Sequence, residues 1–379
     1  MNESLRAIVT VAFLAILTVK VLSAGRVSLG PLTGFVFAPI AYIALVGVVS
    51  SQGLEMFGGL TRWLLYLVTF VYFSADSARE HIEVFVRWSA YALLASFGLS
   101  LLIDQGIYLN GAFRIAGSVG SPIGYASALL ICEVAVLYFY MRDKTRLHLL
   151  LAVLLVIASF GTGTRSIAVC ALTFFVVAWV SSLRTRVGRI TVLILLTATA
   201  TPAVSWLLST TGVGARLLSA NDNSLTYRDF IVSSTLDSLS GWERWFGVGI
   251  GRFAYWFEAT TGVPNVAPHL EWLWILTEGG IVGAIIYFSC LVFASCRVAA
   301  GIRRNSLPVL AGFFILVFLW LQQTALTFAN PAFFYQGMII LFAMLGHLSS
   351  VYRVNLKRYE KNSPASIGQA VQKSARAHF

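Results

Sequence analysis

The residues best suited to chemistry in this sequence are arginines and one histidine near the ends of apolar segments. A guanidinium group binds anions through a bidentate fork, and an imidazole can take up or release a proton near neutral pH. His269 follows Pro264 and Pro268 and opens an apolar segment, which makes it the candidate general base; the alternative is a histidine that only makes a local hydrogen bond at a helix start. The candidate anion-binding residues are Arg114, Arg165, Arg216, Arg228 and Arg252.

Arg165 stands where a long apolar stretch is interrupted. Residues 147–182 are too long for one membrane-spanning helix and are broken at Gly161–Arg165. Two helices of about 15 to 17 residues reach only ~23 to 26 Å, so their junction should lie at or below the headgroup level. A charge at that depth costs at least ~2.5 to 3.5 kcal/mol, and such residues usually face a cavity or a partner. We therefore expect Arg165 to be functional; the alternative is that it only extends toward the surface.

Arg114 and Arg228 lie in two other linkers between apolar segments. No acidic residue closely follows Arg114, which leaves Asp104 as a candidate partner, whereas Arg228 directly precedes Asp229 and can pair with it. A helix is predicted over residues 225–240, and Arg228 borders its apolar face, which favours Arg228 as a ligand-binding residue. That apolar face consists of Leu225, Val232, Leu236 and Leu239.

Other patterns limit the chemistry. No group of Asp, His or Cys residues has the spacing of a metal site, so neither a metal nor another cofactor is expected. Gly247–Gly251 lacks the spacing and the setting of a dinucleotide site, and it predicts a tight turn or closely packed backbone. Glu278 lies about two and a half turns beyond His269, roughly on the opposite helix face. We expect Glu278 to support the site or to pack between helices.

The elements that hold these residues are predicted to be membrane-spanning helices. Of 379 residues, 58% are hydrophobic and only 11% are charged, with a mean hydropathy of +0.80. A soluble domain has about a quarter charged residues. The expected fold class is all-α, a polytopic transmembrane bundle of about 11 spans, with 10 to 12 as the range. The predicted spans are 5–23, 34–50, 59–75, 84–104, 122–140, 147–161, 166–182, 190–208, 270–296, 308–323 and 331–350.

Basic residues in every second linker orient this bundle. They gather near 142–146, 184–189, 297–304 and 353–361, and the positive-inside bias places these segments and the C-terminus in the cytoplasm. The other linkers, and less firmly the N-terminus, then face outward. The net charge of +11 therefore reflects inside-facing loops, and nucleic acid is not an expected partner because so little soluble surface is available.

Three parts of the chain are predicted. Residues 1–350 form one membrane domain, and residues 351–379 form a basic, solvated cytoplasmic tail. Residues 209–269 are the largest outward loop. Within it, Gly241–Phe257 is rich in Trp and Tyr, which favour the headgroup layer, so the loop should follow the membrane surface.

The order of these features resembles the O-antigen ligase and polymerase superfamily, whose members build surface polysaccharides outside the bacterial inner membrane. The residues that carry the resemblance are Arg114–Gly117 with Pro122, Gly163–Ser166, Tyr227–Arg228, Trp245–Phe253 and His269–Gly283. The sequence departs from the usual pattern at Ser166, Leu270 and Gly280, which affects fine positioning more than class.

The resemblance implies a metal-independent, inverting glycosyltransferase of the inner membrane with its active site on the periplasmic side. It would transfer a glycan from undecaprenyl pyrophosphate to an acceptor sugar hydroxyl, without a nucleotide sugar. His269 would take the hydroxyl proton, and Arg165 and Arg228 would stabilise the leaving pyrophosphate. The supporting residues would be Arg114, Arg252 and Arg216 at the substrate, with Tyr227 and Glu278 behind them.

The acceptor distinguishes the alternatives. A polymerase uses another lipid-linked repeat unit, and a ligase uses the lipid A core; the modest outer loop favours the polymerase. Polysaccharide-assembly proteins are possible partners in either case. A transporter or flippase of anionic lipid-linked substrates is the rival class, although the special residues cluster at one face rather than at the bilayer midplane.

Overall fold

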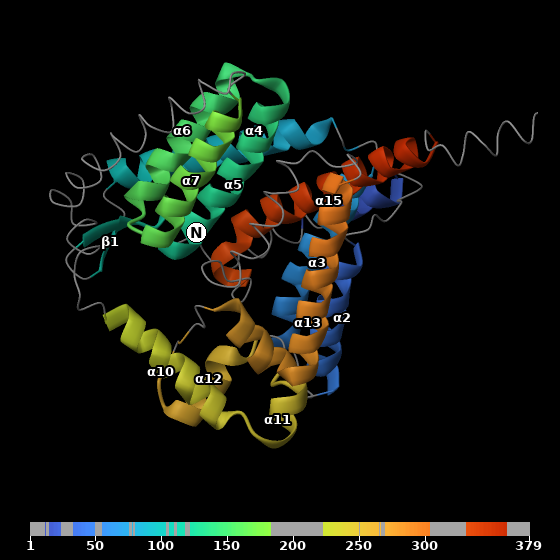
Figure 1. Ribbon diagram of the computed structural model, residues 1–379. Helices are drawn as coiled ribbons and strands as arrows, with labels where there is room; N and C mark the ends of the chain where they lie inside the picture. Colours follow the sequence, from blue (N-terminus) through green and yellow to red (C-terminus); the bar gives the residue numbers. More distant parts are fainter. Residues whose placement is uncertain are drawn as a thin grey trace, which may run out of the picture.

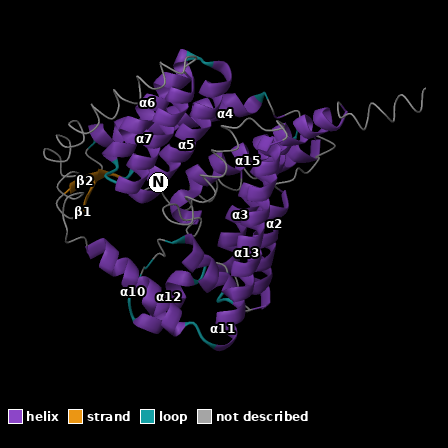
Figure 2. Cartoon of the chain, in the orientation of Figure 1, coloured by secondary structure: helices purple, strands orange, loops and turns teal. Residues whose placement is uncertain are grey.

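The computed structural model describes most of the chain. The described residues are 12, 15–23, 33–49, 55–75, 78, 80–103, 106–109, 112–117, 122–182, 223–249, 251–264, 266, 270–303 and 331–361. Within them the regular structure is almost entirely helical, and the strands form one two-stranded hairpin (Figure 2). A polytopic helical bundle thus fits this part of the chain, with a small β element that the all-α prediction did not include.

The elements follow one another as α2 (Thr33–Val49), α3 (Glu55–Ser74), α4 (His81–Leu102), β1 (Gly106–Leu109), β2 (Ala112–Ile115), α5 (Pro122–Asp143), α6 (Arg146–Gly161), α7 (Arg165–Ser182), α10 (Asn223–Ser238), α11 (Gly241–Phe246), α12 (Phe253–Thr261), α13 (Glu271–Arg303) and α15 (Pro331–Lys361). Each predicted span from 34–50 to 166–182, and those at 270–296 and 331–350, coincides with a helix. The spans at 190–208 and 308–323, and most of 5–23, lie outside the described residues.

Length and hydropathy identify candidate membrane spans among the described helices. Four qualify: His81–Leu102, Pro122–Asp143, Trp272–Arg297 and Gly337–Val354. Shorter apolar helices lie at Trp63–Ser74, Arg146–Gly161 and Ile167–Ser182. The protein is thus a membrane protein with several apolar helices, and the total of about eleven spans stays a prediction.

Helix α5 lies at the centre of one group of helices. Pro122 occupies its first position, where a fixed φ suits a helix start and the missing N–H is not needed. The helix is buried along most of its length because α4, α6, α7 and α15 pack against it. Helix α15 also packs against α3 and runs between this group and the group formed by α2, α3 and α13 (Figure 1). Helices α10 to α12 lie together beside α13.

The hairpin of β1 and β2 occupies a segment that was expected to be a simple linker. Its strands are antiparallel, with Ile107 opposite Arg114 and Gly106 opposite Ile115. The sequence Asn110–Gly111 between the strands is the typical signal of a two-residue hairpin turn, so a local cue for this element was present. The hairpin gives Arg114 a fixed backbone position.

Two helices depart from their predicted bounds or shape. Helix α15 continues to Lys361, past residue 350, where the last span was expected to end. Helix α13 is kinked at Gly280, whose φ of 65° falls in the left-handed region that favours glycine. A residue with this φ is most easily a glycine, which gives a physical reason for the departure from the family pattern at Gly280.

Candidate active site

The turn between α6 and α7 has a defined hydrogen-bonded geometry. The N–H of Gly163 donates to the carbonyl of Phe160 at 3.0 Å, and the N–H of Ala168 donates to the carbonyl of Thr164 at 3.0 Å. Gly163 has a φ of 65°, which a glycine adopts without strain. The chain thus ends one helix and starts the next within three residues, as the break in the apolar pattern predicts.

Arg114 packs directly on this turn. A Cβ added at Gly163 would lie 3.1 Å from Cγ and 3.5 Å from Nε of Arg114, so the glycine leaves room for the arginine side chain. Arg114 is only 8% exposed, and its Nε is buried without a hydrogen-bond partner among the described residues. A buried guanidinium N–H without a partner is costly, by about 1 to 3 kcal/mol or more for a charged group. An anionic ligand at this turn would satisfy it.

The start of α7 adds to the positive potential of the turn. Helix α7 begins at Arg165, so the free N–H groups of its first turn and the positive end of its dipole lie next to Gly163. The hydroxyl oxygen of Thr164, just before the helix, is also buried without a hydrogen-bond partner in the described part of the chain. The structure therefore brings Arg114 to the turn that leads into Arg165 at the start of α7.

A second arrangement surrounds Glu278 in α13. Its carboxylate accepts hydrogen bonds from the backbone N–H of Gly251 at 2.7 Å and of Phe253 at 3.1 Å. These two donors flank Arg252, which is half-buried and precedes α12. Glu278 thus holds the backbone on both sides of Arg252, and its supporting role in the site stays a prediction.

The glycine-rich segment before Arg252 lies close against the kink of α13. The N–H of Val248 donates to the carbonyl of Thr277 at 2.9 Å, and the N–H of Gly249 donates to that of Glu278 at 3.0 Å. A Cβ at Gly247 would overlap the backbone of Glu278, and one at Gly280 would overlap the backbone of Trp245. Gly247 and Gly280 therefore permit backbone-to-backbone contact, as expected for a closely packed turn and not for a nucleotide site.

Arg228 lies on the buried side of α10. It is half-buried, and its Nε has no hydrogen-bond partner among the described residues. The buried residues on this helix are Ile231 and Thr235, at the i+3 and i+7 positions from Arg228. The predicted apolar face was partly wrong, because Leu236 is 48% exposed. Arg228 therefore lies on the buried stripe itself, not only at its border.

Of the expected local pairs, only that of Arg228 with Asp229 lies within the described residues, because Asp104, the candidate partner of Arg114, lies outside them. Across the described residues, no ion pair joins Arg228 to Asp229. Tyr227 is 41% exposed and stacks against Phe230.

Two predicted residues, Arg216 and His269, lie outside the described part of the chain. What the sequence reasoning missed is the contact of Arg114 with Gly163 and the two hydrogen bonds from the loop to Glu278. Each joins segments that are far apart in the sequence. No polar contact within the described residues joins the Arg114 arrangement to the Glu278 arrangement.

Comparison with known proteins finds a family match for part of the chain. A family model described as O-antigen ligase matches residues 150–288, a segment that contains Arg165, Arg228, Arg252 and Glu278. No curated protein matches the chain. The family supports glycosyltransferase activity of the O-antigen ligase and polymerase type, with lipid-linked glycans as its general substrate class. The match over residues 150–288 supports the resemblance to the O-antigen ligase and polymerase superfamily that the motifs predict.

Proposed function

We propose that this protein is an inner-membrane, periplasm-facing glycosyltransferase that moves a glycan from undecaprenyl pyrophosphate to an acceptor sugar hydroxyl. The observation that carries the proposal is the packing of the partly unsatisfied Arg114 on the turn where α7 begins with Arg165. A pyrophosphate needs several preplaced donors, and two guanidinium-bearing segments with a helix N-terminus provide them.

The proposed reaction is a direct displacement. The acceptor hydroxyl oxygen attacks the anomeric carbon while the bond from that carbon to the pyrophosphate oxygen breaks, which inverts the anomeric centre. Negative charge gathers on the leaving pyrophosphate, and preplaced arginines stabilise it without reorganisation. His269 takes the hydroxyl proton. Arg228, Arg252 and Arg216 extend the contact with the substrate, and no metal takes part.

Glu278 and Tyr227 have indirect roles in this proposal. Glu278 fixes the backbone on either side of Arg252 through two hydrogen bonds. Tyr227 precedes Arg228 on α10, and its exposed ring offers a surface for a sugar or a lipid chain. The aromatic side chains on α11 and α12 that are more than half exposed favour a location at the outer headgroup layer. They are Trp242, Trp245 and Tyr255.

The test is a reaction of the purified protein in detergent with the undecaprenyl-pyrophosphate-linked repeat unit alone and no added metal. We expect a ladder of products that is lost in His269→Ala and reduced at least ~100-fold in Arg114→Ala. Arg244→Ala is the matched control, because Arg244 is an exposed arginine on α11 and should keep full activity.

The acceptor is decided in the same assay. A ladder supports the polymerase, which we favour, and product only after addition of lipid A core supports the ligase. Activity that is unchanged in both His269→Ala and Arg114→Ala would refute the proposed site. No product with either acceptor, together with flipping of the lipid-linked substrate in vesicles, would replace the proposal with a transporter.

A further inference from the structure

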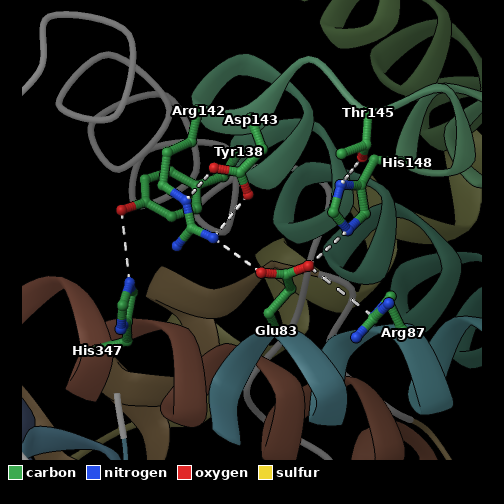
Figure 3. A network of polar contacts seen from close by, with 8 residues as sticks. All are labelled: Glu83, Arg87, Tyr138, Arg142, Asp143, Thr145, His148 and His347. Carbon is green, nitrogen blue, oxygen red and sulfur yellow. Dashed lines mark hydrogen bonds and ion pairs between the residues drawn. The ribbon is translucent and has the colours of Figure 1, made fainter. Parts of the chain in front are cut away.

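A polar cluster lies at the end of the helix bundle opposite the α6–α7 turn. It contains Glu83 near the start of α4, Asp143 at the end of α5 and His148 in the first turn of α6 (Figure 3). His148 and Gly161 lie at opposite ends of α6, about 20 Å apart at 1.5 Å per residue. The cluster is therefore separate from the proposed active site, and the basic residues around it place it on the cytoplasmic side in the predicted topology.

The three side chains are placed as a set of ligands. Their candidate ligand atoms, one carboxylate oxygen each from Glu83 and Asp143 and one ring nitrogen of His148, all lie within 4.8 Å of one another. One imidazole nitrogen and two carboxylate oxygens are a donor set that suits Zn²⁺. Water can supply the fourth position, because Glu83 and Asp143 are partly exposed.

The burial of His148 distinguishes this cluster from an ordinary group of charged side chains on the surface. Its side chain is only 2% exposed. Its Nε2 is buried without a hydrogen-bond partner among the described residues and lies 3.4 Å from the Glu83 carboxylate. Its Nδ1 faces the hydroxyl of Thr145, which fixes the orientation of the ring. Histidine ligands of zinc usually have their second nitrogen held by an oxygen in this way.

Arg142 contacts both carboxylates of the cluster in this structure. Its guanidinium donates to both oxygens of Asp143, at 2.7 and 2.6 Å, and to Glu83 at 2.8 Å. Its side chain is 45% exposed and lies over the ring of Phe139, so it can turn toward solvent without opening the helix bundle. Arg87, whose Nε lies 4.0 Å from Glu83, is the other positive group that faces the cluster. A divalent ion and Arg142 would thus compete for the same oxygens.

We propose that Glu83, Asp143 and His148 form a zinc site that clamps the cytoplasmic ends of α4, α5 and α6. Zn²⁺ bridges the three helices through one ligand from each, and Arg142 releases its carboxylate contacts when the ion binds. The site does not select Mg²⁺ or Ca²⁺, since these ions prefer oxygen ligands alone. Its role is structural, because it lies at the far end of α6 from the arginines of the proposed reaction.

The test uses full-length protein carrying an affinity tag without histidines. The protein is stripped with a chelator, dialysed against Zn²⁺ or Mg²⁺, and analysed for bound metal and thermal unfolding in detergent. We expect roughly one zinc per chain and a higher Tm with Zn²⁺, and neither effect with Mg²⁺. In His148→Ala and in the isosteric Glu83→Gln, zinc binding should fall at least ~10-fold, because a ligand is lost.

Two controls make the result decisive. His81→Ala removes an exposed histidine at the start of α4 and should keep the zinc. Arg142→Gln removes the competing guanidinium and should bind zinc at least as tightly as the unmodified chain. Absence of bound zinc in the unmodified protein, or equal zinc in Glu83→Gln and His81→Ala, would overturn the proposal. Glu83→Gln keeps the shape of the side chain, so it remains informative if His148→Ala fails to fold.

Discussion

Replacement of Glu278 by glutamine tests the link between the kinked α13 and the loop that carries Arg252. The glutamate carboxylate accepts one hydrogen bond on each oxygen, from Gly251 and from Phe253. An amide of the same size keeps only one acceptor oxygen and turns its NH₂ group toward the second donor. Glu278→Gln therefore changes the hydrogen bonding without opening a cavity, and it leaves one backbone N–H facing a donor.

The size of the effect follows from these two bonds. A buried backbone N–H that loses its acceptor costs about 1 to 3 kcal/mol, and we expect a destabilisation of that size. At about 2 °C for each kcal/mol in a large domain, the Tm should fall by roughly 2 to 6 °C.

Thermal unfolding can be followed by the labelling of Cys132, which is fully buried in α5, in a background where the other three free cysteines, Cys170, Cys290 and Cys296, are replaced by alanine. Transferase activity is measured on the same samples below the transition. A shift of about 1 Å in a positioning group can lower turnover ~100-fold, so activity should fall even where the protein is folded. Glu258→Gln, an exposed carboxylate on α12, is the matched control. If Glu278→Gln and Glu258→Gln have the same Tm and the same transferase activity, Glu278 does not hold the loop.

Three further predictions concern the same two arrangements. Gly163→Ala should destabilise the protein by about 1 to 2 kcal/mol and lower activity, because the φ at this position is 65° and the added Cβ would press on Arg114. Thermal unfolding measures the loss of stability, product yield measures the loss of activity, and an unchanged Tm would contradict the contact. Gly247→Ala should destabilise the protein more, since its Cβ would meet the backbone of Glu278 and not a movable side chain. The yield of folded protein from detergent extracts should fall below that of the control Gly241→Ala, whose added Cβ has open space around it. Arg114→Lys should retain less than a tenth of the transferase activity of the unmodified protein, because an ammonium group cannot reproduce the bidentate fork. Near-normal turnover would show that only the positive charge is needed.

Sequence patterns predicted the parts of the fold that depend on local composition. Continuous apolar runs fix where helices form in a membrane, because every backbone polar group must be satisfied inside the segment. The break at Gly161–Arg165 and the closely packed turn at Gly247–Gly251 were predicted in the same way and are confirmed by the described geometry. The hairpin was missed although Asn110–Gly111 signals it, because each strand has only four residues.

The sequence by itself determined that this chain is a helical membrane protein with arginines at interrupted or linker segments, since hydropathy and charge are properties of composition and order. Only the tertiary structure decided which of these residues meet. Arg114 reaches Gly163 because the hairpin folds back on the α6–α7 turn, and Glu278 holds the residues beside Arg252 because α13 kinks at Gly280. Glu83, Asp143 and His148 converge because three helix ends pack together. Such contacts depend on how whole helices pack, and no local pattern of residues specifies them.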